Sequence, residues 1–490
     1  MRTLSEHPSV PLLGWLGTVA ILASCSGDVP TSATEDLPSL NQASTAGYSV
    51  CHRTGAAGTI IQVSASDLAR HQRHGDYLST LFASHQSDQP QDAAHFRHIG
   101  DALTAARDGR LARGELQSAA CRITIDVAAG TFRGTDDFAN TDRSLEHFPF
   151  VVDVPDITLH GALEMRLDAN GRAIGTSVTQ QRTTLLPIAP LSDAGGNGLI
   201  LIIADPSASS GNGLTLEGFA LRSGRLPGAD VVGFGVLSFQ ASGLTLRGNR
   251  LEGFVETIDL QGSSAVVESN HISEGGQCDL CIAGPGVYRV AGNTVLGGGT
   301  HGIFTSPAIN TEPVGPGPSE IFADIINNEV RDHRQQPISA GIRVGAVGLG
   351  APDVPGSSHI RIRDNLLVNN NFGLMLDALF PQPDTRLKGD IEVTTSGNVV
   401  RRSCQADLLV AFARHTTALG VTSGAYLLNS TYRLTLDDLP FSQAWFSNPP
   451  GLGNTLRVNG HTIAHTTRQF FEETSCPGTP GMPASIARAE

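Results

Sequence analysis

The sequence predicts an all-β fold in which the chain winds into a solenoid of short parallel strands. Its 490 residues include 55 Gly and 27 Pro but few aromatic residues, a composition that favours short strands joined by tight turns. The phrase NGLTLEGFALRSG at 212–224 returns in similar form as SGLTLRGNRLEGF at 242–254. Self-similarity at such a short period indicates a repeat architecture.

The turns of the predicted coils are marked by six asparagines: Asn249, Asn270, Asn293, Asn328, Asn365 and Asn398. Coils stacked about 4.8 Å apart pair their strands in parallel and align like side chains inside, which one coil alone cannot do. Asn tolerates the left-handed backbone of a sharp turn, and its amide can hydrogen-bond to the Asn of the next coil. Longer steps carry Pro/Gly-rich insertions at 306–320 and 348–359, which we expect to overhang one side and wall a groove.

A capping helix is expected at 98–110, because Ile99, Leu103 and Ala106 fall on one side of it. The alternating strand CRITIDVAAGTFRG follows at 121–134. This opening and the later repeats resemble the right-handed parallel β-helix of the pectin-lyase-like fold over roughly 98–440. The resemblance implies a β-helix with a C-terminal cap over 98–475 and a tail at 476–490. It leaves function open, because the fold hosts lyases, hydrolases, esterases and non-catalytic adhesins.

Residues 1–24 predict an export signal, with an apolar run at 10–23 that is too short for a confident membrane span. The run ends in Leu-Ala-Ser-Cys, which resembles a bacterial lipobox and implies lipidation of Cys25. The alternatives are a plain signal peptide or a short anchor. We expect a disordered linker at 25–47 and an exported protein that is lipid-anchored at the outer membrane or cell surface.

Residues 48–80 are similar to a small module of exported bacterial proteins with the pattern Cys-His-x-Thr-Gly and then His-x-x-His-Gly-Asp. Four of its residues are ordinary zinc ligands: Cys51, His52, His71 and His74. The alternative is that Cys51 forms a disulfide while the histidines cap and pack the small fold. Six cysteines remain after Cys25, which suits disulfides in an exported chain, and Cys278–Cys281 is the easiest local pair. A polar linker is expected at 81–97.

The candidate catalytic residues Glu256, Asp279 and His301 are 23 and 22 residues apart, so equivalent positions on consecutive coils predict a stripe on one outer face. Two carboxylates and a His in a groove suit the general acid–base chemistry of glycoside hydrolysis. Stacked polar residues also arise in repeat proteins by construction, so the alternative is a solvent-facing ladder.

The stripe resembles an altered polygalacturonase site. That resemblance implies catalytic roles for Glu256, Asp279 and His301, and for Arg343 on a later coil. Three departures from the family pattern are Leu280 in place of a carboxylate, Thr300 in place of Gly, and Gly345 in place of the Lys that pairs with an acidic sugar.

A polysaccharide lyase would instead use an Arg base with calcium, and Arg361 and Arg363 beside Asp364 share a strand. The net charge of −14 argues against nucleic-acid binding. The sequence therefore predicts a monomeric envelope lipoprotein whose β-helix groove binds, and in the enzymatic case cleaves, an extended polysaccharide. The alternative is a non-catalytic, adhesin-like surface protein.

Overall fold

The computed structural model describes residues 47–54, 57–85, 92–137, 139–176, 182–189, 198–205, 209–224, 233–298, 300–307, 319–334, 339–346, 356–378, 388–412, 427–437, 444–448 and 450–463. The predicted signal peptide, the lipidation site Cys25, the linker at 25–47, most of both insertions and the tail at 476–490 lie outside these ranges. Among the described residues, no helix has the length and apolar character of a membrane span.

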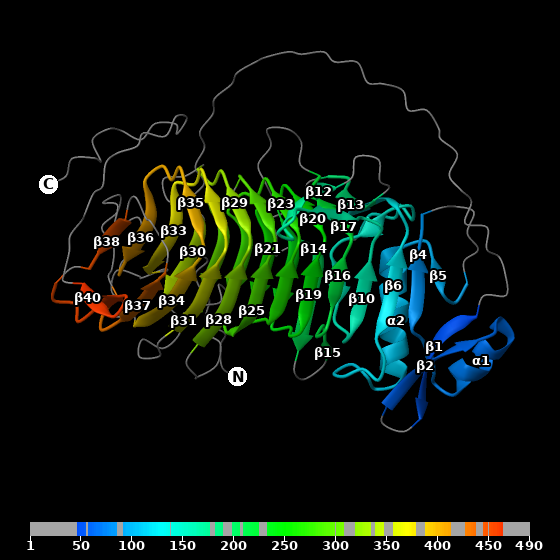
Figure 1. The fold of residues 1–490 in the computed structure, drawn as a ribbon. Helices are drawn as coiled ribbons and strands as arrows, with labels where there is room; N and C mark the ends of the chain where they lie inside the picture. The colour runs from blue at the N-terminus through cyan, green and yellow to red at the C-terminus, as the bar shows by residue number, and fades with distance from the viewer. Residues whose placement is uncertain are drawn as a thin grey trace, which may run out of the picture. The chain divides into compact units, whose positions relative to one another are not determined.

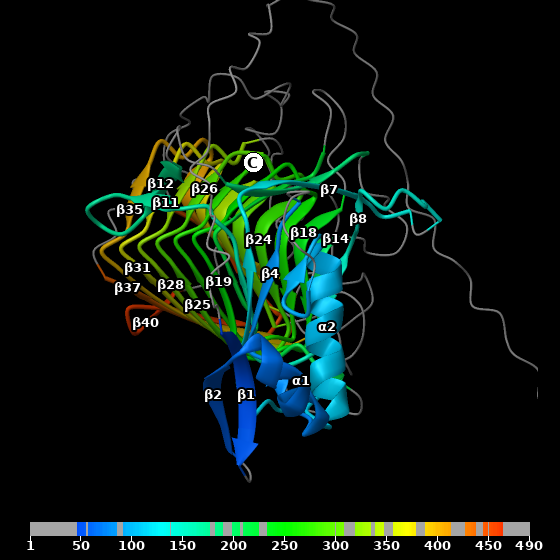
Figure 2. The ribbon, with the colours of Figure 1, turned by 90° about the vertical axis from the view of Figure 1, so that its right-hand side faces the viewer.

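The described chain is a right-handed parallel β-helix built from three long sheets, which Figures 1 and 2 show from the side and turned by 90°. The fourteen-stranded sheet contains β4 (Thr80–Ala83), β5 (His95–Phe96), β6 (Ile123–Val127), β10 (Ile157–His160), β16 (Thr215–Glu217), β19 (Leu244–Arg247), β22 (Ala265–Glu268), β25 (Gly286–Ala291), β28 (Ser319–Ile326), β31 (Gly356–Arg363), β34 (Gly389–Ser396), β37 (Thr431–Leu436), β39 (Thr455–Val458) and β40 (His461–Ile463).

The other two long sheets complete each coil. The ten-stranded sheet contains β7 (Gly130–Thr135), β8 (Glu146–His147), β13 (Thr183–Pro187), β17 (Phe219–Arg222), β20 (Arg250–Glu252), β23 (His271–Ser273), β26 (Thr294–Leu296), β29 (Glu329–Arg331), β32 (Leu366–Val368) and β35 (Val399–Arg401). The eleven-stranded sheet contains β9 (Phe150–Val152), β14 (Gly198–Asp205), β15 (Ser209–Ser210), β18 (Phe234–Phe239), β21 (Glu256–Gln261), β24 (Cys278–Ala283), β27 (His301–Ser306), β30 (Ala340–Ala346), β33 (Phe372–Ala378), β36 (Ala406–Ala411) and β38 (Ala444–Ser447).

Each central coil contributes one strand to each sheet, as in β19–β20–β21 followed by β22–β23–β24. Parallel pairing in register stacks apolar side chains into continuous buried columns. One such column consists of Ile258, Leu280, Ile303, Ile342 and Leu374, all buried. The predicted solenoid is confirmed, and its core is the shared interior of these columns.

The six predicted asparagines form a buried ladder where the chain passes from the fourteen-stranded to the ten-stranded sheet. Each of the first five amides donates to the Oδ1 of the next Asn, at 3.1, 3.0, 2.9, 3.0 and 2.9 Å in chain order. The backbone N–H of each of these five Asn residues donates to that same oxygen. The ladder therefore satisfies the polar groups of the corner without water.

The sequence suggested that the ladder Asn itself has the left-handed backbone of each corner. In the structure, the residue before it has this conformation. Positive φ angles of 55–64° occur at Gly248, Ser269, Gly292, Asn327, Asp364 and Gly397. The sharp reversal is thus made one position earlier, which turns the following Asn side chain into the interior. Gly, Asn and Asp favour this conformation, and Ser269 adopts it as well, so the position is not reserved for residues that favour it.

The N-terminal part contains the three-stranded sheet of β1 (Tyr48–Thr54), β2 (Ala57–Val63) and β3 (Tyr77–Leu78) with α1 (Ala65–Arg73). The predicted capping helix is α2 (Ile99–Ala112), which lies beside β6 (Figure 1). Its buried apolar residues belong to the same core as the first coils: Ile99, Ala102, Leu103 and Ala106. The expected linker at 81–97 is wrong in its described part, because β4 and β5 pair within the fourteen-stranded sheet.

A two-stranded hairpin of β11 (Met165–Leu167) and β12 (Ala173–Thr176) reaches along the solenoid to later coils. Arg172 donates to the carbonyl of Asn327 at 3.1 Å and to that of Asp364 at 2.9 Å. The backbone N–H of Ala173 donates to Gly292. Contacts this distant in sequence fix an early segment across several coils.

Candidate functional site

The outer face of the eleven-stranded sheet carries most of the predicted catalytic residues because its strand pairing skips one position. Glu256 pairs with Cys278 and Cys278 with His301, and pairing then resumes two residues later at Ile258, Leu280 and Ile303. Since the apolar column faces the core, the skip places positions 256, 278 and 301 on the same outer side as positions 259, 281 and 304. Three contacts between these positions agree: a Glu256–Asp259 hydrogen bond, the Cys278–Cys281 disulfide, and His301 stacked on Phe304.

Glu256 and Asp259 form a buried carboxyl pair on this face. Glu256 is 9% exposed and Asp259 1%. Burial raises the pKa of both groups, and the negative charge of Asp259 raises that of Glu256 further. The amide of Gln261 donates to Asp259 at 2.6 Å. Two carboxyls in hydrogen-bond contact with raised pKa values share a proton near neutral pH, and Glu256 is the more exposed of the two.

His301, Arg343 and Asp377 form the second polar group of the face. Arg343 donates to both carboxylate oxygens of Asp377, at 2.8 and 2.9 Å, and its Nη1 lies 2.8 Å from His301 Nε2. A guanidinium can only donate, so His301 Nε2 accepts this hydrogen bond and carries no proton. The guanidinium also lies over the Phe304 ring, 5.5 Å from its centroid. Arg343 is thereby fixed and neutralised by Asp377.

Asp279 is not part of the outer stripe, which corrects the predicted alignment. It occupies the skipped position together with Thr257 and Gly302, and its side chain is fully buried. A Cβ built on Gly275 would lie 1.9 Å from Asp279 Oδ1, and His333 Nε2 lies 3.6 Å from Oδ2. Burial raises the pKa of Asp279 to about 8, outweighing contacts from the Gly275 N–H and the Thr257 hydroxyl. The side chain therefore points into the corner.

The structure thus brings Glu256, His301 and Arg343 onto one face and separates Asp279 from them. Sequence reasoning missed Asp259, Gln261 and Asp377. Glu256 and His301 stand two strands apart, about 10 Å between their backbones at the usual strand spacing. Beyond Arg343 the face becomes apolar, with a buried cluster of Ala340, Phe372, Met375, Ala406, Leu409, Ala411 and Trp445.

The arginines of the lyase hypothesis lie on a different sheet. Arg361 and Arg363 do share a face of β31, as expected, and both contact Asp324, at 3.6 and 2.8 Å. Neither of the described His/Cys/Asp/Glu clusters with metal-ligand spacing includes Asp324 or Asp364. An arginine paired with a carboxylate is a poor base, so this arrangement does not favour elimination chemistry.

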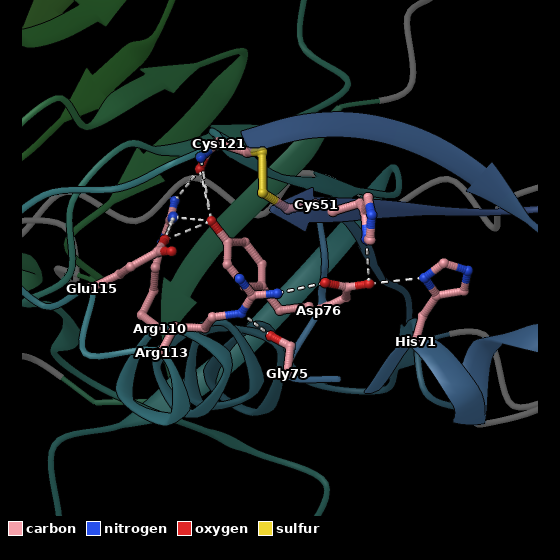
Figure 3. Close-up of polar contacts among 10 residues, drawn as sticks. Cys51, His71, Gly75, Asp76, Arg110, Arg113, Glu115 and Cys121 are labelled. Carbon is pink, nitrogen blue, oxygen red and sulfur yellow. Dashed lines mark hydrogen bonds and ion pairs between the residues drawn. A yellow bond between two sulfur atoms is a disulfide. The ribbon is translucent and has the colours of Figure 1, made fainter. Parts of the chain in front are cut away.

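The N-terminal module does not assemble the four predicted zinc ligands. Cys51 forms a disulfide with Cys121, as the alternative had it, and His74 lies at the C-terminal end of α1. His52 and His71 instead place Nδ1 at 2.8 Å from the same oxygen of Asp76 (Figure 3). Cys51 is excluded as a ligand because its sulfur is bonded to another sulfur.

Asp76 is the centre of this module's polar network. Its side chain is 2% exposed and also accepts a hydrogen bond from Arg113, which donates to the Gly75 carbonyl as well (Figure 3). Burial alone would raise the pKa of Asp76, but the hydrogen bonds from His52 and His71 and the charge of Arg113 outweigh it and lower the pKa. These contacts are those of a hydrogen-bonded network and do not call for a metal ion.

The disulfides agree with the expectation from the cysteine number. Cys278–Cys281 is the predicted local pair, Cys51–Cys121 spans 70 residues, and Cys404 is also disulfide-bonded.

Comparisons with known proteins identify solved structures that share the architecture. No protein-family model matches the chain, and no curated protein matches its sequence. DFA-IIIase from Arthrobacter chlorophenolicus A6 in complex with GF2 is 11% identical, with a TM-score of 0.41, over 82% of this chain and 99% of that one. The A-module of the Azotobacter vinelandii mannuronan C-5 epimerase AlgE4 is 15% identical, with a TM-score of 0.37, over 72% and 88%.

The catalytic domain of a GH87 α-1,3-glucanase in complex with nigerose is also similar, at 12% identity and a TM-score of 0.35, over 77% of this chain and 69% of that one. Values this low carry no information about the substrate of this chain. Its chemistry has to be inferred from its own residues.

Proposed function

We propose that the outer face of the eleven-stranded sheet, from β21 to β33, binds an extended polysaccharide and hydrolyses it. The observation that carries the proposal is the Glu256–Asp259 pair, a proton-sharing carboxyl pair placed on the same face as His301 and Arg343. An extended polymer can contact several coils in succession, because consecutive strands present the same face at a regular spacing.

The carboxyl pair is suited to the role of a general acid. Protonating a glycosidic oxygen requires a carboxylic acid that keeps its proton near neutral pH, and burial gives Glu256 and Asp259 that property. Because it is the more exposed of the two, Glu256 is assigned as the proton donor. It gives the shared proton to the glycosidic oxygen as the bond from that oxygen to the anomeric carbon breaks, and the water that adds to this carbon returns a proton to the carboxyl pair. A direct pair is too close to be the two separate carboxyls of an ordinary hydrolase, which stand about 5 Å or more apart.

Arg343 and Asp377 are assigned a positioning role. Their two-pronged contact holds His301 through its Nε2, and the compensated charge makes Arg343 a weak partner for an acidic sugar. We therefore propose a neutral polysaccharide rather than a polyuronate. The chemistry follows from the acid pair and does not require the calcium that a lyase would use.

The test is a panel of neutral and acidic polysaccharides incubated with the purified chain. Reducing-end release reports hydrolysis, and unsaturated-uronate absorbance reports elimination. We expect reducing ends from a neutral polymer, with kcat lowered about 100-fold or more in Glu256→Gln, because an amide cannot donate an acidic proton. The matched control is Glu252→Gln, a carboxylate on β20 of the ten-stranded sheet, which we expect to leave the rate unchanged.

Unsaturated products would show that the chain cleaves its substrate by elimination and not by hydrolysis. Binding in affinity electrophoresis without either product would reduce the proposal to a binding module. If no polysaccharide binds, the adhesin-like alternative takes its place.

We also propose that the chain is exported and lipid-anchored through Cys25. The disulfide between Cys51 and Cys121 supports an oxidising compartment, where such bonds persist. In a bacterial host, metabolic labelling with a fatty acid should mark the wild-type protein and not Cys25→Ser, which should leave the membrane fraction. Labelling that survives this substitution would contradict the anchor.

A further inference from the structure

A second histidine cluster lies where three segments of the N-terminal cap meet, and the proposed function does not use it. His85 follows β4, His98 directly precedes α2, and Glu146 begins β8. His85 Nε2 lies 3.8 Å and His98 Nδ1 3.4 Å from the same carboxylate oxygen, Glu146 Oε1. The three ligand atoms all lie within 4.8 Å of one another. The Glu146 side chain is 1% exposed, and the two histidines are largely buried.

These distances differ in kind from those of the module's network. Histidine–carboxylate hydrogen bonds are about 2.7–3.2 Å long, as at His52 and His71, which both lie 2.8 Å from Asp76. Two ligands bound at about 2.0–2.2 Å to a tetrahedral zinc ion stand roughly 3.4 Å apart. The His98–Glu146 separation of 3.4 Å matches such an edge, and the His85–Glu146 separation of 3.8 Å is slightly longer.

The ligand atoms at this second cluster also lack the short hydrogen bonds that His52 and His71 make. His85 Nε2 and His98 Nδ1 are buried, and within the described ranges neither makes a hydrogen bond of ordinary length; both lie nearest to the Glu146 carboxylate, at 3.8 and 3.4 Å. Both nitrogens face one carboxylate. A buried imidazole nitrogen without a hydrogen bond of ordinary length is costly, and a bound cation would remove that cost.

The outer contacts are those that hold metal ligands in place. Glu146 accepts the backbone N–H of Ile99 at 3.0 Å and that of Gly100 at 3.4 Å. The His85 ring packs against Phe132 with centroids 4.3 Å apart. Backbone N–H groups that donate to a ligating carboxylate orient it toward a metal ion.

We propose that His85, His98 and Glu146 bind one zinc ion, with water in the fourth position. Two imidazoles and a carboxylate form an ordinary zinc ligand set. The ion would join the end of β4, the start of α2 and β8, and so stabilise the cap on which the first coil is built. This site is distinct from the predicted set at Cys51, His52, His71 and His74.

The experiment uses the full purified chain after removal of metal with a chelator. Zinc titration by calorimetry, with the stoichiometry checked by mass spectrometry of the metal, should show one ion per chain. His98→Ala and His85→Ala should weaken binding by at least about 100-fold, more than the loss of an outer contact does. Zinc should raise the melting temperature of the wild type and not of these variants. Cobalt substitution should give the absorption of a low-coordinate site in the wild type.

Matched controls separate this cluster from the rest of the cap. His95→Ala removes a partly exposed histidine three residues from His98, and His52→Ala with His71→Ala removes the module's pair. Both should keep full zinc binding. Glu146→Gln should lose zinc but can still accept the Ile99 N–H, so it tests ligation with the helix start preserved.

Three results would overturn the proposal: no zinc bound by the metal-free wild type, binding unchanged in folded His85→Ala and His98→Ala, or binding lost only in the module variant. Circular dichroism identifies the variants that fold. If His98→Ala does not fold, the more exposed His85 provides the deciding variant.

Discussion

Each coil has two regions that stack on the next coil with the same geometry but carry different residues: the asparagine corner and the strand of the eleven-stranded sheet. At the corner before the ten-stranded sheet, every coil from Asn249 to Asn398 places the same residue in the same position, and each amide is satisfied by the next. On the eleven-stranded sheet, successive coils place Glu256, Cys278, His301 and Ala340 at one position. The same residue repeated at the corner forms a closed ladder of hydrogen bonds. Different residues at one position of the sheet instead form separate groups with distinct chemistry.

The skipped pairing position explains why the chemistry gathers on the second side. A regular strand would have turned Glu256 and His301 inward and left Asp279 outside, because side chains alternate along a strand. The skip reverses this assignment at each coil. The outer face therefore depends on one local irregularity in strand pairing that is repeated along the solenoid. Substitutions on the two sides of the coil test this difference.

The largest effect is expected at Arg343 on the variable side. Arg343→Ala leaves the fully buried Asp377 without its two-pronged partner, which should lower the free energy of unfolding by about 3–5 kcal/mol. Arg343→Lys keeps the positive charge but cannot make both hydrogen bonds to Asp377, so it should lower the free energy of unfolding by less than Arg343→Ala does. Urea unfolding measures both.

The matched control is Arg361→Ala, which removes an arginine 64% exposed from its pair with Asp324. Its cost should stay within about 1 kcal/mol, since exposed ion pairs contribute little. Equal costs for the two alanine variants would mean that the Arg343 pair is not buried as described.

A substitution inside the asparagine ladder should lower the free energy of unfolding by nearly as much. Asn270→Ala removes donors to Leu246 and Asn293 and the acceptor used by Asn249. Unfolding should become easier by about 2–4 kcal/mol, because buried partners are left unsatisfied.

Asn398 provides the comparison within the same ladder. It is 7% exposed, and Asn365 is the ladder neighbour that donates to it. Asn398→Ala should therefore cost less in urea unfolding, since water can reach the groups it leaves. A greater loss at Asn398 than at Asn270 would contradict a ladder that closes from coil to coil.

The sequence allowed the repeated side to be predicted almost completely. All six asparagines belong to the ladder because identical residues at a regular period have one stable arrangement, the stack. The error concerned the backbone: the left-handed residue precedes the Asn, and its identity varies from Gly248 to Ser269 and Asp364. A position occupied by several residue types gives no clear signal.

The variable side was predicted only in part, because register cannot be read from spacing alone. Cys278, one residue before Asp279, is the residue that pairs with Glu256 and His301. Because side chains alternate between the two faces of a strand, this difference of one residue places Asp279 on the opposite face. Aligning the coils on Ile258, Leu280 and Ile303 would have placed Asp259 and Arg343 in one row. The Cys51–Cys121 bond was beyond prediction, since its partners are 70 residues apart.

A pH dependence of the folding stability distinguishes the buried Asp279 from the carboxyl pair on the outer face. Because burial raises the pKa of Asp279 to about 8, the folded chain holds this proton at pH values where the unfolded chain, with an ordinary pKa near 3.9, has lost it. Stability due to this group therefore falls as pH rises from about 4 to 8. Asp279→Asn removes that loss, so its stability relative to the wild type should be greater at pH 8 than at pH 5.

Glu256→Gln should flatten the same slope of stability against pH, since the pKa of Glu256 is also raised, but it should lower kcat for hydrolysis about 100-fold or more while Asp279→Asn retains it. Urea unfolding at the two pH values together with the reducing-end assay measures both properties on both variants. A loss of hydrolysis in folded Asp279→Asn would place that carboxyl among the reacting groups. The division between an interior corner and an outer face, on which the assignment of Glu256 rests, would then be wrong.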